Sequence, residues 1–151
     1  ISVDLTDRKI RQDVLAKIAA KTKKALVITE GVILYLSEEH VGELSSDLIS
    51  HPQFHYWMTE KIQPIMKKYM TSGRREKEMR NAPLIFWPSD WTGFFTSRGW
   101  REFETQYADE RSLQIGRPLP MPMWAKVIFK ILPIKPKPRR LLGYTLWTPK
   151  N

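Results

Sequence analysis

The 151-residue chain contains no cysteine, which excludes disulfides and thiolate chemistry and fits a cytoplasmic protein. No uninterrupted apolar run approaches the roughly 20 residues that a membrane-spanning helix needs. No two of the seven glycines are two positions apart, so the dinucleotide-binding pattern G-x-G-x-x-G is absent. The P-loop, the G-x-S-x-G nucleophile turn and the H-E-x-x-H zinc motif are absent as well. The sequence therefore lacks the common short signatures of nucleotide binding, hydrolysis and metal catalysis.

Metal-ligating and catalytic residues are equally sparse. His51 and His55 are four positions apart, but Pro52 between them argues against one regular helix face, and no third ligand lies nearby. We therefore expect no metal site. No residue stands out as a nucleophile or as an acid–base pair, so we assign no catalytic residue. If the protein carries out chemistry, we expect it to position a reactive cofactor.

The chain is rich in positive charge and in apolar residues. It carries 25 basic and 16 acidic residues, a net charge of +9, and 42% of its residues are hydrophobic. This composition is that of a globular protein, and the length suits one domain over residues 1–151. The first residues, Ile1 to Leu5, have the pattern of the end of a strand. We expect that an N-terminal part of the domain is absent from this chain.

The most informative segment begins at Ala25 and reads A-L-V-I-T-E-G-V-I-L-Y-L. Its four leading apolar residues are typical of a strand buried on both faces, as in a parallel sheet. The run ends at Glu30 and Gly31, a carboxylate and a glycine at the carboxyl end of the strand. Ligands of open α/β sheets bind at the carboxyl ends of the strands. Glu30 is therefore our first candidate for a ligand-binding residue.

Other segments complete an alternating pattern of helices and strands. Apolar residues at helical spacing predict a helix that follows a cap at Thr6 or Asp7, with Ile10, Val14, Leu15 and Ile18 facing a sheet. A second helix is expected after Ser37. We also expect a helix over 54–70, a strand at 84–87, a short helix over 90–98, a helix at 123–132, and late strands at 101–107 and 144–147. This order predicts an α/β fold with an antiparallel addition at one edge.

Several motifs, taken in order, resemble one known family. They are V-D-L-T-D at 3–7, T-E-G-V-I-L-Y-L at 29–36, N-A-P-L-I-F at 81–86, F-F at 94–95, G-W at 99–100, R-P-L-P at 117–120 and L-G-Y at 142–144. Together they resemble the C-terminal half of the leucine carboxyl methyltransferase-like family, which belongs to the class I S-adenosylmethionine-dependent methyltransferases. Each motif alone is weak, and the ordered series carries the resemblance.

The resemblance implies a Rossmann-like, seven-stranded methyltransferase sheet that is mixed and ends in an antiparallel hairpin. Residues 1–5 would be the end of strand three and 25–29 strand four. Residues 84–87, 101–107 and 143–148 would be strands five, six and seven. The glycine-rich cofactor loop of the family would precede Ile1. The fragment alone is therefore expected to be inactive, and the enzymatic activity would belong to a longer parent protein.

The resemblance also implies site residues and an activity. Asp4 and Leu5 match the family's residues on the adenine side of S-adenosylmethionine, and Glu30 and Gly31 match those beside the bound cofactor. Tyr35 is a candidate for the substrate side. The implied reaction is O-methylation of a carboxylate or hydroxyl group on a small molecule or a protein. Outside the resemblance, Asp4 and Thr6 are better explained as turn and capping residues, whereas Glu30-Gly31 is explained equally well as an ordinary exit from a strand.

A second class of function is a basic binding module. Six lysines and arginines cluster around apolar residues between Trp124 and Arg140. Such a segment can lie on an anionic membrane surface or contact nucleic acid phosphates. We favour the simpler interpretation of a solvated basic face next to a core-facing helix. We also expect that the edge of the 25–29 strand lacks a partner in this chain, so the fragment can self-associate there.

Overall fold

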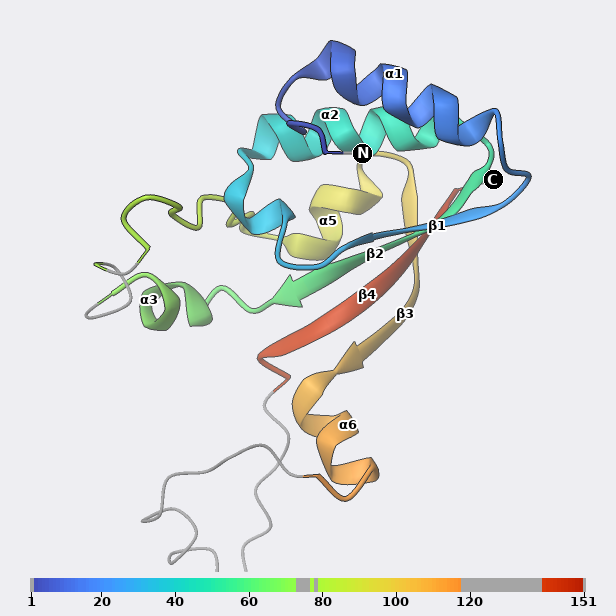
Figure 1. The fold of residues 1–151 in the computed structure, drawn as a ribbon. Coiled ribbons are helices and arrows are strands. Elements are labelled where there is room, and N and C mark those ends of the chain that lie inside the picture. The colour runs from blue at the N-terminus through green and yellow to red at the C-terminus, as the bar shows by residue number, and fades with distance from the viewer. Residues whose placement is uncertain (1, 73–76, 78, 118–139, 151) are drawn as a thin grey trace, which may run out of the picture.

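The computed structural model describes residues 2–72, 77, 79–117 and 140–150, and its fold is shown in Figure 1. The helices are α1 (Arg8–Ala19), α2 (Glu38–Ile49), α3 (Met66–Met70), α5 (Trp91–Thr96) and α6 (Ala108–Gln114), with a 3₁₀ turn η1 (Ile33–Tyr35). The strands are β1 (Ala25–Thr29), β2 (Phe54–Ile62), β3 (Trp100–Tyr107) and β4 (Leu142–Pro149). The helix expected at 123–132 lies outside the described residues.

The four strands form one mixed sheet in the order β1-β2-β4-β3. β1 and β2 are parallel, whereas β4 runs antiparallel to both β2 and β3. The prediction of an α/β fold with an antiparallel addition at one edge is therefore confirmed. Because β4 reverses direction, its first residues lie beside the carboxyl end of β2, and the chain gathers side chains from three strands at that end of the sheet.

The helix predicted over 54–70 is wrong over its first half, which forms the strand β2. The segment is rich in aromatic and β-branched residues, which favour a half-buried pleated surface. Pro64 follows the end of this strand instead of kinking a helix. β2 pairs with β1 on one side and with β4 on the other, so it is central. Tertiary pairing therefore decides the conformation of a segment whose local pattern is ambiguous.

The strand predicted at 84–87 is also wrong. This run forms no helix or strand, and the backbone N–H groups of Ile85 and Phe86 both donate to the carbonyl of Leu34, at 2.8 and 3.1 Å. Phe86 is fully buried against the aromatic side chains of α5. The apolar run thus fills the space between η1 and α5 and contributes no strand to the sheet.

The predicted helix caps are confirmed, but the predicted burial of the apolar residues on α1 is wrong at two positions. Asp7 and Ser37 each accept a hydrogen bond from a first-turn amide of the following helix, as predicted, and Asp90, for which no cap was predicted, does the same for α5. On α1, however, Ile10 and Ile18 are 45% and 41% exposed, because this helix packs on the outside of α2 and not on the sheet. Only Leu15 and Ala19 of α1 reach the core, and the prediction that Ile10 and Ile18 face a sheet is wrong.

The core is built from aromatic side chains between the sheet and the helices. Trp57, Trp100 and Trp147 are completely buried. The ring of Phe95 stacks on Trp147 at 4.7 Å between centroids and meets Trp57 edge-on at 5.2 Å. The indole N–H groups are satisfied by hydroxyl groups, as when Trp147 donates to Thr59 at 2.9 Å. These large side chains hold the sheet against α2 and α5.

The opposite face of the sheet is uncovered in the described part of the chain. Figure 1 shows α1, α2 and α5 on one and the same side of the sheet. Side chains that point to the other side are partly or largely exposed, and they include Leu26, Ile28, Tyr56, Met58, Phe103 and Leu146. We call this surface the bare face. Parallel strands are normally covered on both faces, so an apolar bare face beside a parallel pair is unusual.

Candidate functional site

The turn that follows β1 presents Glu30 and Gly31 at the carboxyl end of this strand. The Glu30 side chain is exposed, and its Oε1 accepts a hydrogen bond of 2.9 Å from the hydroxyl of Tyr144. Gly31 adopts a left-handed conformation with φ of +62°. A Cβ atom there would meet nothing within 4 Å, so glycine is favoured by conformation and not by crowding. The chain turns sharply here and leaves the Glu30 carboxylate accessible.

Glu60 lies directly behind this turn, near the carboxyl end of β2. Its side chain is only 4% exposed, and its Oε1 accepts a hydrogen bond from the Gly31 backbone N–H. Its other oxygen, Oε2, is buried without a partner among the described residues. Burial raises the pKa of Glu60, and the nearby charge of Glu30 raises it further. Glu60 therefore keeps its proton to a higher pH than an ordinary glutamate.

Tyr144 completes this group from β4. The antiparallel register places it directly opposite Glu60, and its hydroxyl reaches Glu30 across the end of the sheet. Burial raises the pKa of Tyr144, and the hydrogen bond to Glu30 and the charges of Glu30 and Glu60 act in the same direction. The hydroxyl is thus held in its protonated form, as a donor to Glu30.

Sequence reasoning missed both Glu60 and Tyr144. The signal for Glu60 is the same as that for Glu30, a carboxylate near the carboxyl end of a parallel strand. It was lost because the 54–62 segment was read as a helix. The position of Tyr144 depends on strand register, which no local pattern specifies.

Asp4 and Leu5 lie in the turn before α1. Asp4 Oδ1 accepts hydrogen bonds from the backbone N–H and the hydroxyl of Thr6, both at 2.8 Å, and these bonds lower the pKa of Asp4. Leu5 packs against the core, and its carbonyl accepts a hydrogen bond from Arg11. Asp4 therefore stabilises the turn before α1. Its contact with a cofactor remains a prediction.

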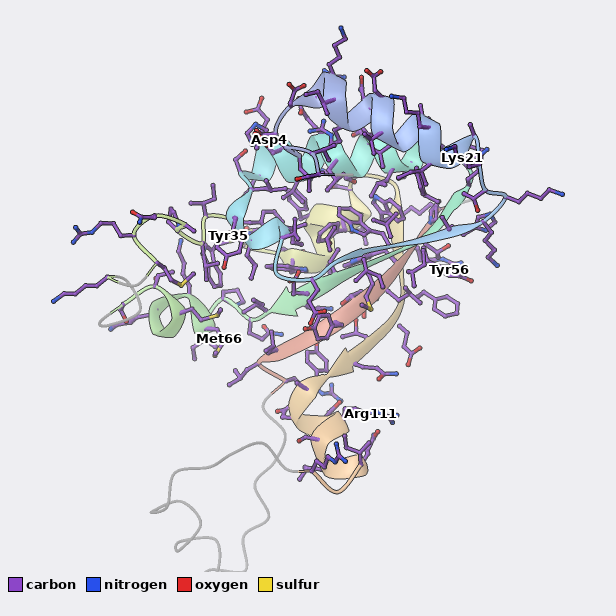
Figure 2. All side chains as sticks on the ribbon, in the orientation of Figure 1. Asp4, Lys21, Tyr35, Tyr56, Met66 and Arg111 are labelled. Atoms are coloured by element: carbon purple, nitrogen blue, oxygen red, sulfur yellow. The ribbon has the colours of Figure 1, made fainter. Side chains whose placement is uncertain are left out.

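Tyr35 is the last residue of η1, and it is 42% exposed. Its neighbours Ile33 and Leu34 are buried and fix the turn on the core. Figure 2 shows Asp4 and Tyr35 at the end of the molecule toward which β1 and β2 run. The candidate residues Asp4, Glu30 and Tyr35, which come from three separate segments, thus lie toward one end of the sheet. Glu30 accepts a hydrogen bond from Tyr144, and Gly31 donates one to Glu60.

A cavity of about 470 Å³ adjoins Glu30 and Tyr144 on the bare face. Its apolar part is formed by Leu26, Met58 and Leu146, and its polar part by Glu30, Glu104, Gln106 and Tyr144. Two carboxylates beside an apolar floor suit a ligand that combines a flat apolar group with hydroxyl groups or positive charge. The size lies within the range of small-molecule sites.

Within the described ranges, no cluster of three or more histidine, cysteine, aspartate or glutamate side chains could hold a metal ion. In the same part of the chain, no helix has both the length and the apolar character to cross a membrane. Neither a family model nor a curated protein matches the chain.

Proposed function

We propose that the chain is the C-terminal part of an S-adenosylmethionine-dependent O-methyltransferase domain. The observation that carries the proposal is the Glu30–Gly31 turn at the carboxyl end of a parallel strand, with Glu30 exposed and oriented by Tyr144. Ligands of open α/β sheets bind at this end. Within the proposal, Asp4, Leu5, Glu30 and Gly31 hold the cofactor, and Tyr35 lies on the substrate side.

The residues around Glu30 fit such a cofactor chemically. Carboxylates of Glu30 and Asp4 accept hydrogen bonds from hydroxyl or amino groups and favour a positively charged ligand. The left-handed Gly31 carries no side chain toward the ligand space. The cavity beside Glu30 adds apolar surface for a flat ring. The order of strands also agrees with the proposal, because β1 is an edge strand to which a further parallel strand of a larger sheet can be added.

S-Adenosylmethionine supplies an activated methyl group on a sulfonium sulfur. The methyl group would pass to an acceptor oxygen, and the sulfur would keep the electron pair of the broken bond. The contribution of the protein is to bind and align donor and acceptor. A carboxylate acceptor is ionised at neutral pH and needs no base, whereas a hydroxyl acceptor needs one. The described residues of the site include no evident nucleophile, so the proposal gives the accessible Glu30 carboxylate a role in binding and none in covalent chemistry.

The proposal is tested by calorimetric titration of S-adenosylmethionine into the chain and into the same protein with any residues that precede Ile1 in its gene. Glu30→Ala is the test variant. Glu39→Ala, which removes an exposed carboxylate in the first turn of α2, is the matched control. Saturable binding that only Glu30→Ala weakens is the expected result. A folded protein that binds no cofactor in either form would refute the proposal.

The alternative of a basic binding module gains no support from the described residues. Apart from Arg140, the segment 126–140 lies outside them. Arg140 donates its Nε–H to Glu110 at 2.7 Å and its backbone N–H to Asp109 at 2.9 Å. Its guanidinium is therefore paired within the molecule, and no described observation favours phosphate or membrane binding.

A further inference from the structure

A buried carboxyl group lies beneath the accessible one at the end of β1. Glu60 is 4% exposed, whereas Glu30 is exposed. The two are joined through the backbone, because Glu60 Oε1 accepts a hydrogen bond from the N–H of Gly31, the residue that follows Glu30. In the described part of the chain, none of the ion pairs involves Glu60. A buried carboxylate without a cationic partner is costly, so the neutral form of Glu60 is favoured.

Two titratable side chains face Glu60 from the neighbouring strands, and neither supplies positive charge. Glu30 follows β1, and Tyr144 lies directly opposite Glu60 on β4 and donates its hydroxyl to Glu30 at 2.9 Å. Burial is the main cause that raises the pKa of Glu60, and the charge of Glu30 adds to it. Lys61, the next residue on β2, is paired with Glu102 at 2.9 Å. The protonation of Glu60 therefore depends on its burial and on the charge at Glu30.

We propose that Glu60 is a positioning residue that gives up its proton when a positively charged ligand binds at Glu30, an assignment that rests on the proposed function. Oε1 of Glu60 is engaged by the Gly31 N–H, so the proton of the neutral form lies on Oε2. A bound cation offsets the negative charge of Glu30, and the charged form of Glu60 then costs less. The O–H bond of Glu60 breaks, and the proton passes to the solvent.

Ionisation of Glu60 also strengthens the turn on which Glu30 lies. In the neutral form, the N–H of Gly31 donates to an uncharged carboxyl oxygen. After the proton leaves, the same hydrogen bond is charge-assisted and roughly twice as strong. Gly31 holds its left-handed conformation at this point, with φ of +62°. The ligand therefore reinforces the backbone contact that orients the carboxylate to which it binds.

The coupling has a definite sign with pH. A cation at Glu30 lowers the pKa of Glu60, so binding releases protons between the pKa of the liganded protein and the raised pKa of the free protein. Affinity rises as the pH increases through this window, and the gain is complete above the pKa of the free protein. For charges that interact near a protein surface we expect a change of roughly one pKa unit, which corresponds to about tenfold in affinity.

Carbon NMR of the ligand-free 151-residue chain tests the coupling without any cofactor. The carboxyl resonance of Glu60, assigned by its loss in Glu60→Gln, is followed with pH. Glu30→Gln removes the negative charge, as a bound cation would offset it, and should lower the titration midpoint of Glu60 by roughly one unit. Glu39→Gln, at an exposed position in the first turn of α2, is the control and should leave the midpoint unchanged. A midpoint that ignores Glu30→Gln would overturn the proposal.

Calorimetry with S-adenosylmethionine measures the proton release itself. The 151-residue chain and the longer form that includes any preceding residues are titrated between about pH 5 and pH 8, in buffers of different ionisation enthalpy, with and without Glu60→Gln. This variant keeps an acceptor for the Gly31 N–H but has no titrating proton, and the groups of the ligand titrate identically with both proteins.

We expect the affinity of the wild type to rise with pH by about tenfold more than that of Glu60→Gln, with more protons released on binding. Equal proton release by the two proteins would overturn the role of Glu60 and leave the proposed function intact. Absence of binding in every form would refute the proposed function, and the role of Glu60 in ligand binding with it. The two failures are therefore distinguishable.

Discussion

Arg11 offers the sharpest test of how the site is held in place. The side chain is 1% exposed and lies between α1 and α2. Its Nε–H donates to Asp47 at 2.7 Å, one terminal N–H donates to Glu43 at 3.0 Å, and the other donates to the carbonyl of Leu5. Arg11 therefore ties the turn with Asp4 and Leu5 to α2 through one buried cation.

Replacement of Arg11 by methionine keeps the side chain long and apolar but removes the cation. Asp47, whose side chain is 9% exposed, then loses its charged partner, and the Leu5 carbonyl loses its donor. Breaking a buried ion pair by removing one partner costs about 3–5 kcal/mol, a large share of the roughly 5–15 kcal/mol that stabilises a typical domain. For a chain of this length we expect the Tm to fall by about 6–20 °C.

The assay is urea unfolding followed by tryptophan fluorescence. Arg8→Met, at an exposed position of the same helix, is the control and should change the unfolding free energy by less than about 0.5 kcal/mol. Addition of Asp47→Leu to Arg11→Met removes the uncompensated buried charge and should recover part of the loss. A cost below about 1 kcal/mol for Arg11→Met, or further destabilisation by the second substitution, would refute the reasoning.

Three further predictions concern the strand ends. The pKa of Glu60 is raised in the folded state, so the protonated carboxyl stabilises the fold fully below the ordinary pKa of 4.5. This stabilisation is lost as the pH rises through the folded-state pKa. Glu60→Gln should therefore flatten the pH dependence of the unfolding free energy, measured between about pH 4 and pH 8. Gly31→Ala should cost about 1–2 kcal/mol of unfolding free energy through its positive φ alone, and Gly116→Ala, equally uncrowded at φ +69°, should cost the same. Tyr144→Phe should lower stability by about 0.5–1.5 kcal/mol in thermal unfolding, the value of its hydrogen bond to Glu30.

The sequence contains the local signals of this fold more completely than the long-range ones. The β1 run and the caps at Asp7 and Ser37 follow from residue type and spacing, and they were predicted. The 54–62 segment was not, because its conformation depends on pairing with β1 and β4 on both sides. The apolar run at 84–87 lacks such pairing and packs as a loop.

The residues of the candidate site show the same difference between local and long-range signals. Glu30 and Gly31 are adjacent in the sequence, so their position at a strand end could be inferred from one segment. Glu60 and Tyr144 reach them from 29 and 114 residues away, through strand pairing alone. A local pattern identifies which strand end carries a carboxylate. A local pattern cannot identify the buried carboxyl of Glu60 or the hydroxyl of Tyr144, because strand pairing places these groups next to Glu30 and Gly31.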